Sequence, residues 1–359
     1  MTMLDHRRDG TVPSAAPTLE PAPGTTAGIT ADPCWIRPGR TLLVTSNGGH
    51  LEQMLRLRPR FLPQLDDVEW ATFDTPQSRH LLSGETVHHI PFVRPKDLRG
   101  TVLNSTAAAR LLGGDHHRFT RVVSTGAAVA IPFLARARAL GLAAHYIESA
   151  ARSEGSSVSG SVVSRIPGVR LYGQYPGWTA GRWQFRGSVL DGFAPGSQRS
   201  PRPIDKVVVT FGTQRDFGFR RAAERLVSLL PDVCTTSPTI LWQTGATDTN
   251  GLRIPAVESV PANVLVDAVA EADLVISHSG VGTALLTLEH GKCPVMLPRR
   301  SDLGEHTDDH QRLIAMELGR RGLAVWSDPD DLTAEGLHRA ALMTAVRDSA
   351  PPRFLLQPD

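Results

Sequence analysis

Short apolar, β-branched runs alternate with segments of helical period along most of this chain, and no other feature constrains its fold as much. Parallel strands cannot be joined by tight hairpins and need crossover connections, which are usually helices. We therefore expect an α/β fold built on parallel sheets. The first series comprises predicted strands at 42–45, 68–72, 122–124 and 143–147 and predicted helices at 51–60 and 129–140.

A second series of the same kind begins at residue 207, and a stretch rich in Gly, Pro and Ser at 187–203 separates it from the first. That composition is typical of an exposed linker. A length of 359 residues also suits two domains better than one. We predict Rossmann-like domains at 41–198 and 199–359, facing each other across a cleft. The second series comprises predicted strands at 207–211, 240–243, 274–277, 295–297 and 324–326 and predicted helices at 219–230, 280–290 and 306–321.

Residues 1–40 are rich in Pro, Ala, Thr and Gly and are predicted to be a disordered leader, because they cannot bury enough apolar surface to offset the entropy of ordering. The longest apolar stretch, 127–144, contains Pro132 and two arginines, so we expect no segment that crosses a bilayer. The scattered cysteines and the absence of a secretion signal predict a cytoplasmic protein. A net charge of +2 gives no reason to expect a nucleic-acid partner.

Ligands of open parallel sheets bind beyond the carboxyl ends of the strands, so the loops after strands are candidates for the active site. The first such loop carries Asn47, Gly48, Gly49 and His50. Paired glycines allow close approach of a ligand, and His50 could take a proton from an acceptor hydroxyl as a general base. In the alternative interpretation the glycines form an ordinary turn that His50 caps. Glu148, which ends a later strand of the same domain, is the second candidate for the base.

Two loops of the second domain suit an anion. The turn that follows its first predicted strand presents N–H and hydroxyl groups, although an ordinary turn explains it equally well. The segment 278–283 (HSGVGT) opens a predicted helix, whose N–H groups and dipole favour a diphosphate. Its alternative interpretation is capping by Ser279, with glycines for close packing. The residues assigned to the donor from these loops are Gly212, Thr213, Gln214, His278, Ser279, Gly280, Gly282 and Thr283.

A strongly polar loop at 298–311 combines carboxylate, imidazole and amide groups, which suit the donors and acceptors of sugar hydroxyls. The alternative is a solvated helix start. His306 and His310 have the spacing of a metal pair, but no third ligand stands nearby, and no metal is predicted. The residues assigned to donor binding from this loop are Arg299, His306, Asp309 and Gln311.

One D-x-D string, Asp328-Pro329-Asp330, could hold a divalent metal on a nucleotide diphosphate. It stands between a predicted strand and the last predicted helix, so we interpret its carboxylates as turn and cap groups. We therefore predict metal-independent chemistry with no cofactor. Backbone N–H groups and a nearby arginine would neutralise the leaving group.

Taken together, these motifs resemble those of a known group of glycosyltransferases. Residues 41–193, with the motifs SNGGH, STGAA, HYIES and QYP, resemble the acceptor-side subunit of the two-subunit N-acetylglucosaminyltransferase of lipid-linked glycan assembly. Residues 207–332 resemble its donor-side catalytic subunit in the HSGVGT motif and in the polar loop. Both halves are also similar to paired bacterial polysaccharide glycosyltransferases and, more distantly, to the transferase that completes the lipid-linked peptidoglycan precursor. The chain looks like a fusion of the two subunits.

The resemblance implies the GT-B fold, inversion at the anomeric carbon and a UDP-sugar donor, carrying GlcNAc or another hexose, in the second domain. It also implies a polyprenyl-diphosphate-linked acceptor in the first domain, as in cell-surface polysaccharide or glycan synthesis. His50 matches a histidine proposed for acceptor binding or base catalysis, and Gln311 matches a glutamine near the donor sugar. The acceptor-binding residues implied are Asn47, Gly48, Gly49, Thr125, Gly126 and Arg152.

Two departures from the family pattern bear on function. Relatives often have a ribose-binding glutamate where this chain has Leu286, and Glu289 follows one turn later. The acceptor-side subunit of eukaryotes carries a membrane anchor, whereas here we expect peripheral attachment to the inner face of the cell membrane through apolar and basic residues at 92–99 or 133–138.

Three other functions remain open from the sequence. A transferase could act on a soluble secondary metabolite instead of a lipid. A UDP-sugar epimerase would bind the same nucleotide sugar in the cleft and need no acceptor. A non-enzymatic scaffold for a partner transferase is disfavoured by the complete set of donor motifs.

Overall fold

The computed structural model describes residues 39–62, 64–65, 67–92, 98–114, 119–152, 154–178, 181–212, 216–307 and 309–358. The predicted leader at 1–40 lies outside these ranges except for its last two residues, and Arg40 already belongs to the first strand.

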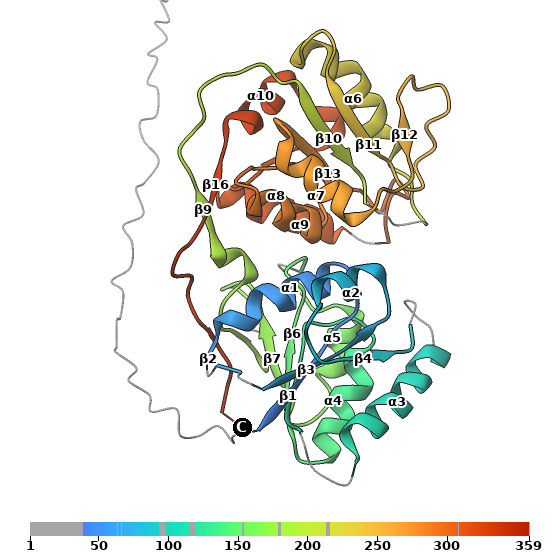
Figure 1. Ribbon diagram of the computed structural model, residues 1–359, viewed down its shortest axis with the longest axis vertical. Helices are drawn as coiled ribbons and strands as arrows, with labels where there is room; N and C mark the ends of the chain where they lie inside the picture. Colours follow the sequence, from blue (N-terminus) through green and yellow to red (C-terminus); the bar gives the residue numbers. More distant parts are fainter. Residues whose placement is uncertain are drawn as a thin grey trace, which may run out of the picture. The chain divides into compact units, whose positions relative to one another are not determined.

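The first half of the chain, coloured from blue to green in Figure 1, forms a parallel sheet. Within the described residues this sheet has seven strands, in the order β4-β3-β1-β5-β6-β7-β8. All six residues of β3 are buried, as expected where helices cover both faces of a parallel sheet. The strands are β1 (Arg40–Val44), β3 (Val68–Phe73), β4 (Val87–Ile90), β5 (Phe119–Ser124), β6 (Ala143–Ile147), β7 (Arg170–Gly173) and β8 (Trp183–Phe185). The helices are α1 (Gly49–Leu57), α2 (Pro76–Leu81), α3 (Leu98–Leu112), α4 (Ala130–Ala139) and α5 (Val158–Val163), and η1 (Arg58–Arg60) and β2 (Phe61–Leu62) follow α1.

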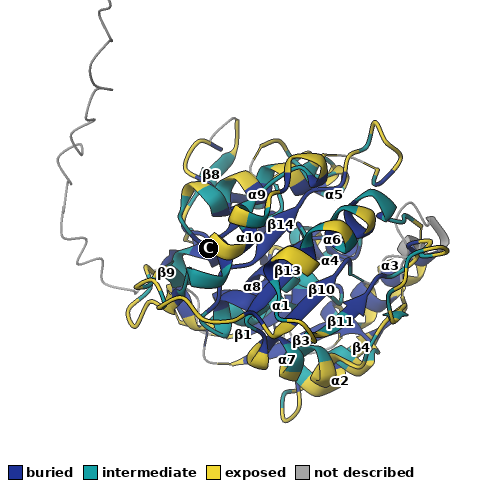
Figure 2. Ribbon diagram, turned by 90° about the horizontal axis from the view of Figure 1, so that it is seen from above, coloured by how far each residue is buried: buried dark blue, intermediate teal, exposed yellow. Residues whose placement is uncertain are grey.

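The second half forms a parallel sheet of six strands, again within the described residues, in the order β12-β11-β10-β13-β14-β15. Its central strands are buried (Figure 2). The strands are β10 (Lys206–Thr210), β11 (Thr239–Gln243), β12 (Ala256–Val257), β13 (Leu274–His278), β14 (Val295–Leu297) and β15 (Val325–Trp326). The helices are α6 (Arg220–Val233), α7 (Ala262–Glu271), α8 (Val281–Glu289), α9 (His310–Arg320) and α10 (Ala334–Leu342), with η3 (Pro329–Asp331) before α10.

These two sheets confirm the predicted α/β fold with two Rossmann-like halves. The segment between them is more ordered than its composition indicates. It forms η2 (Val189–Gly192) and β9 (Phe193–Pro195), and Ser188 and Leu190 are fully buried. The first part of the segment is therefore not the exposed linker that we predicted, because its apolar residues pack into the core.

The last residues of the chain return to the first sheet's side of the structure. β16 (Ala345–Arg347) pairs with β9, and β17 (Phe354–Leu355) pairs with β2. The Gln357 backbone N–H donates to the Tyr172 hydroxyl at 2.9 Å. The strand pattern of the sequence did not indicate this return.

The two predicted membrane contacts have different outcomes. Phe133 and Leu134 are fully buried, because α4 turns its apolar side chains toward the sheet, so the prediction for 133–138 is wrong. Phe92 is 57% exposed, but residues 93–97 lie outside the described ranges. Within those ranges, no helix combines the length and the apolar character that crossing a bilayer requires.

Candidate active site

The predicted loops lie at the places where each sheet reverses its strand order. In the first sheet β1 lies between β3 and β5, and in the second β10 lies between β11 and β13. Open parallel sheets bind ligands at such switch points, beyond the carboxyl ends of the strands. His50 is the second residue of α1, directly after the loop that follows β1, and Thr125 lies in the loop after β5. The loops after β10 and β13 carry Gly212 and Gly280.

His50 is fixed by two reciprocal hydrogen bonds with Thr125. With its proton on Nδ1, the ring donates to the Thr125 carbonyl oxygen at 2.7 Å, and Thr125 Oγ1 donates to the His50 carbonyl oxygen at 2.9 Å. Desolvation of the partly buried ring lowers the pKa of the imidazole, against the opposing effects of the Thr125 carbonyl and Glu148. Among the described residues nothing bonds to Nε2, so a neutral ring presents that nitrogen as a proton acceptor.

The backbone around His50 adopts conformations that favour glycine. Gly48 has φ +71° and Gly126 has φ +111°, and Ala127 also has a positive φ of 66°. A Cβ at Gly126 would lie 3.1 Å from His50 Cε1, so a larger residue there would crowd the ring. Asn47 lies half-buried in the same loop, and the Gly48 N–H donates to Gln77 Oε1 at 2.7 Å. These glycines therefore set the position of the histidine as well as the turn.

Glu148 is buried and heavily hydrogen-bonded. Its Oε2 accepts from the N–H and the hydroxyl of Ser157, both at 3.0 Å, and its Oε1 accepts from the Ser149 N–H at 3.1 Å. This carboxylate anchors the start of α5, an arrangement that leaves it poorly placed to act as the second candidate base. Arg152 follows in the same loop, and its N–H donates to the Ser149 carbonyl oxygen at 2.9 Å.

Sequence reasoning missed a buried pair of amides that supports the His50 loop. Gln53 Nε2 donates to the Gly49 carbonyl oxygen at 3.1 Å, and its Oε1 accepts from the Ala150 N–H at 2.8 Å. Gln174 Nε2 donates to the same Oε1 at 2.9 Å and to the Glu148 carbonyl oxygen at 2.8 Å. The QYP motif contained Gln174, but nothing in the sequence indicated that it bonds to a helix more than a hundred residues earlier.

His278 separates the two glycine loops of the second half. A Cβ at Gly212 would lie 2.7 Å from its Cε1, and a Cβ at Gly280 would lie 2.4 Å from its Nε2. The imidazole between the two loops thus leaves no room for a side chain at either glycine. The sequence did not indicate this steric requirement. Burial, and then the nearby charge of Arg299, lowers the pKa of His278 to about 3, so the ring is neutral at physiological pH. Thr213 and Gln214 lie outside the described residues.

The end of β13 carries buried polar groups with unmet hydrogen-bonding capacity. In the described part of the chain, Ser277 Oγ, His278 Nδ1 and Ser279 Oγ have no hydrogen-bond partner. Buried polar atoms are normally paired, and exceptions call for an explanation such as a ligand or water. α8 begins directly beyond them at Val281, with Gly282 and Thr283 in its first turn.

The loops of the two halves meet. A Cβ at Gly49, the first residue of α1, would lie 3.8 Å from the Gly282 nitrogen in the first turn of α8. Near the other end of both helices, Arg56 donates to the two carboxylate oxygens of Glu289 at 2.8 and 2.6 Å. The helices therefore run side by side in the same direction, and both N-termini open at one place. The Glu289 carboxylate also pairs with Arg347 at 3.2 Å. These ion pairs do not favour the contact with a ribose for which the position of Glu289 in the sequence made it a candidate.

Hydrogen bonds between its own residues hold the polar loop in place. Asp309 Oδ1 accepts from the N–H and hydroxyl of Ser301, both at 2.9 Å, and Gln311 Oε1 accepts from the Arg299 N–H at 3.1 Å. The His306 and His310 rings lie 4.8 Å apart. α9 begins at His310, four residues later than predicted, and Asp309 directly before it is bonded to Ser301 instead of entering the helix.

The two aspartates of the D-x-D string form a helix cap and ion pairs. Asp328 Oδ1 accepts from the Asp330 N–H at 3.1 Å at the start of η3. Arg221 donates to the carboxylates of both aspartates. Among the described residues no cluster of His, Cys, Asp and Glu has the arrangement of a metal site.

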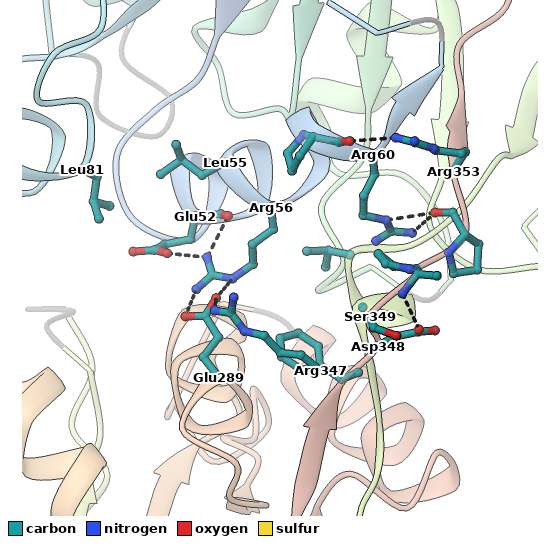
Figure 3. A pocket seen from close by; sticks show the side chains of 17 residues that line it. Glu52, Leu55, Arg56, Arg60, Leu81, Glu289, Arg347, Asp348, Ser349 and Arg353 are labelled. Carbon is teal, nitrogen blue, oxygen red and sulfur yellow. Dashed lines mark hydrogen bonds and ion pairs between the residues drawn. The ribbon is translucent and has the colours of Figure 1, made fainter.

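A large cavity lies away from these loops. Its volume is about 1030 Å³, and neither His50 nor the first turn of α8 lines it. Figure 3 shows that Arg56 lies there between Glu52 and Glu289, with Arg60 and Arg353 on the other side. The cavity is therefore separate from the candidate active site.

Comparison with known proteins finds a similarity in the second half of the chain. Residues 206–345 match the glycosyltransferase family 28 C-terminal domain. The UDP-N-acetylglucosamine--N-acetylmuramyl-(pentapeptide) pyrophosphoryl-undecaprenol N-acetylglucosamine transferase of Cupriavidus necator is 31% identical over 139 residues. That match spans 37% of this chain and 37% of the relative.

Two solved structures have a similar fold. MurG from Acinetobacter baumannii has a TM-score of 0.51 at 20% identity and covers 84% of this chain and 89% of its own. The UDP-GlcNAc 2-epimerase from Methanocaldococcus jannaschii has a TM-score of 0.54 at 10% identity, with 88% and 95% covered. Identities this low establish the fold alone. Residues 206–345 are thus similar to the glycosyltransferase family 28 C-terminal domain, and the chain as a whole has the GT-B fold.

Proposed function

We propose that this chain is an inverting glycosyltransferase that moves a hexose, such as GlcNAc, from a UDP-sugar to an acceptor hydroxyl. The closeness of the two switch-point segments carries the proposal, since a Cβ at Gly49 would lie 3.8 Å from the Gly282 nitrogen. One loop offers a base and the other offers the N-terminus of α8 to an anion. The match of residues 206–345 to a glycosyltransferase domain supports the donor side.

In this proposal His50 is the base. The acceptor oxygen bonds to the anomeric carbon while the bond from that carbon to the diphosphate breaks, and the electron pair of the broken bond leaves with UDP. His50 Nε2 takes the proton of the acceptor hydroxyl. Attack from the face opposite the leaving group inverts the anomeric centre. The lowered pKa of His50 keeps the ring in the neutral form that this step requires.

The donor diphosphate is proposed to bind at the first turn of α8 without a metal ion. Backbone N–H groups and the helix dipole stabilise negative charge there. Asp328 and Asp330, the carboxylates that could have held a divalent ion, are engaged by Arg221, which supports this part of the proposal. The remaining donor contacts are assigned to His306, Asp309 and Gln311 of the polar loop.

The acceptor is proposed to be a polyprenyl-diphosphate-linked sugar at the inner face of the cell membrane, held by the loops of Asn47, Thr125 and Arg152. The name of the Cupriavidus necator relative, a pyrophosphoryl-undecaprenol transferase, supports a lipid-linked substrate. The alternatives are a soluble metabolite as acceptor and an epimerase reaction on the UDP-sugar itself, for which the fold would also serve.

The test is a panel of UDP-linked sugars, with thermal unfolding as the first measurement. A ligand that binds only the folded state raises the melting temperature, so the correct donor should stabilise the protein more than UDP-sugars that do not fit. Product analysis without an acceptor then separates the functions. A changed sugar would establish an epimerase, whereas a transferase should give only slow release of UDP. If no UDP-sugar protects the protein, the proposal is wrong.

A further inference from the structure

Arg299 is a buried arginine two residues beyond the end of β14. It is 1% exposed, and its Nη2 donates to the Phe211 carbonyl oxygen at 3.0 Å. Its guanidinium carbon lies 5.5 Å from the centre of the Phe219 ring. Its Nε and Nη1 are buried and have no acceptor in the part of the chain that the structure describes. Of the three guanidinium nitrogens, Nη2 alone has an acceptor among the described residues. Nε and Nη1 could therefore donate to an anion.

No carboxylate among the described residues is bonded to this charge. Burial lowers the pKa of Arg299 to about 10, so the group is still protonated at neutral pH. Glu305, the nearest acidic influence, directs both carboxylate oxygens to Arg221 at 3.1 Å. A buried cation without a bonded anion lowers the stability of the folded state. An arginine at this position therefore needs a reason other than stability.

The surroundings of Arg299 suggest that reason. His278 pairs in register with Leu297, so the end of β13 and the loop that carries Arg299 are neighbours. The unpartnered atoms Ser277 Oγ, His278 Nδ1 and Ser279 Oγ belong to that same end of β13. The positive charge of Arg299 also lowers the pKa of His278. Unsatisfied hydroxyls and an unsatisfied guanidinium together suit a phosphate group.

We propose that Arg299 supplies the buried positive charge that holds the diphosphate of the nucleotide donor, and that the protein carries this charge at a cost in stability. The inference rests on the function proposed above and assigns the neutralising charge of that site to one side chain. The guanidinium donates to the Phe211 carbonyl oxygen and its loop neighbours the end of β13, where the Ser277 and Ser279 hydroxyls can bind the same phosphates.

The test compares UDP with uridine in the variant Arg299→Met, which keeps the length and apolar character of the stem. We expect UDP affinity, measured by calorimetry, to fall by at least about tenfold while uridine affinity changes by less than about twofold. Without ligand, the variant should melt at a higher temperature than the wild type, because an uncompensated buried charge has been removed. Arg299→Lys should retain part of the UDP affinity, since it keeps a charge but not the planar donor geometry.

Arg300→Met is the matched control. Arg300 is exposed and pairs with Asp302 at 2.6 Å, so its removal should leave UDP affinity and melting temperature unchanged. If Arg299→Met lowers UDP and uridine affinity equally, or lowers the melting temperature, Arg299 is a structural strut for Phe211 and the inference is wrong. If the wild type itself does not bind UDP, the proposed function fails instead. Wild-type binding with an unaffected Arg299→Met variant refutes this inference alone.

Discussion

The two ring nitrogens of His50 differ in what surrounds them. Nδ1 is bonded to the Thr125 carbonyl oxygen, and Nε2 has no bonded neighbour among the described residues. A positioned base typically contributes about 10²–10⁴-fold to the rate, so we expect His50→Ala to lower kcat by about that factor. UDP affinity should stay nearly constant, because the proposed donor site lies in the other half. A variant that keeps more than about a third of wild-type kcat would show that His50 is a turn residue.

The pH dependence of activity tests the same residue. Desolvation places the pKa of His50 below its usual value of about 6.5, so the neutral base persists into mildly acidic solution. We expect kcat/KM to be flat through neutral pH and to fall only as the pH drops through this lowered pKa. The acidic limb should be absent from the residual activity of His50→Ala. A limb centred clearly above about 6.5 would contradict the desolvated environment.

At the scale of elements, the paired N-termini of α1 and α8 form the centre of the proposed site. Gly282 lies in the first turn of α8, and a Cβ there would meet the Gly49 Cα at 3.9 Å, which is ordinary contact distance. Gly282→Ala should therefore fold and bind UDP with a modest loss. The larger side chain of Gly282→Val enters the space where phosphate approaches, and we expect UDP binding to weaken by at least about tenfold, or about 1.4 kcal/mol. Unchanged calorimetric affinity in a folded Gly282→Val variant would rule out this site.

At the scale of the whole molecule, the C-terminal residues join distant parts of the chain. The ring of Phe354 is fully buried, 5.6 Å from Phe61 and 5.5 Å from Tyr172. We expect Phe354→Ala to lower the free energy of unfolding by about 3–5 kcal/mol, measured by denaturant titration. Leu355, which is 36% exposed, is the control, and Leu355→Ala should cost less than about 1 kcal/mol. Equal effects of the two variants would show that the tail is not packed as described.

The sequence by itself determined the α/β class, the two series of strands and the loops in which a ligand site should be sought. It could do so because strand and helix periods, glycine pairs and strand ends are local features of the chain. For the same reason it identified the D-x-D string as a turn and cap, which the bond from the Asp330 N–H to Asp328 supports.

The tertiary structure decided which of those residues meet. Gln53 and Gln174 form one hydrogen-bonded pair, and β17 joins β2, across separations that no local pattern records. The glycines at 212 and 280 were assigned to phosphate approach, but the His278 ring between them gives them a second function. Arg299 was assigned to donor binding as part of a polar loop, and the structure shows that it is buried without a bonded carboxylate among the described residues. Burial and pairing of charge depend on how separate elements pack, and that information exists only once the chain has folded.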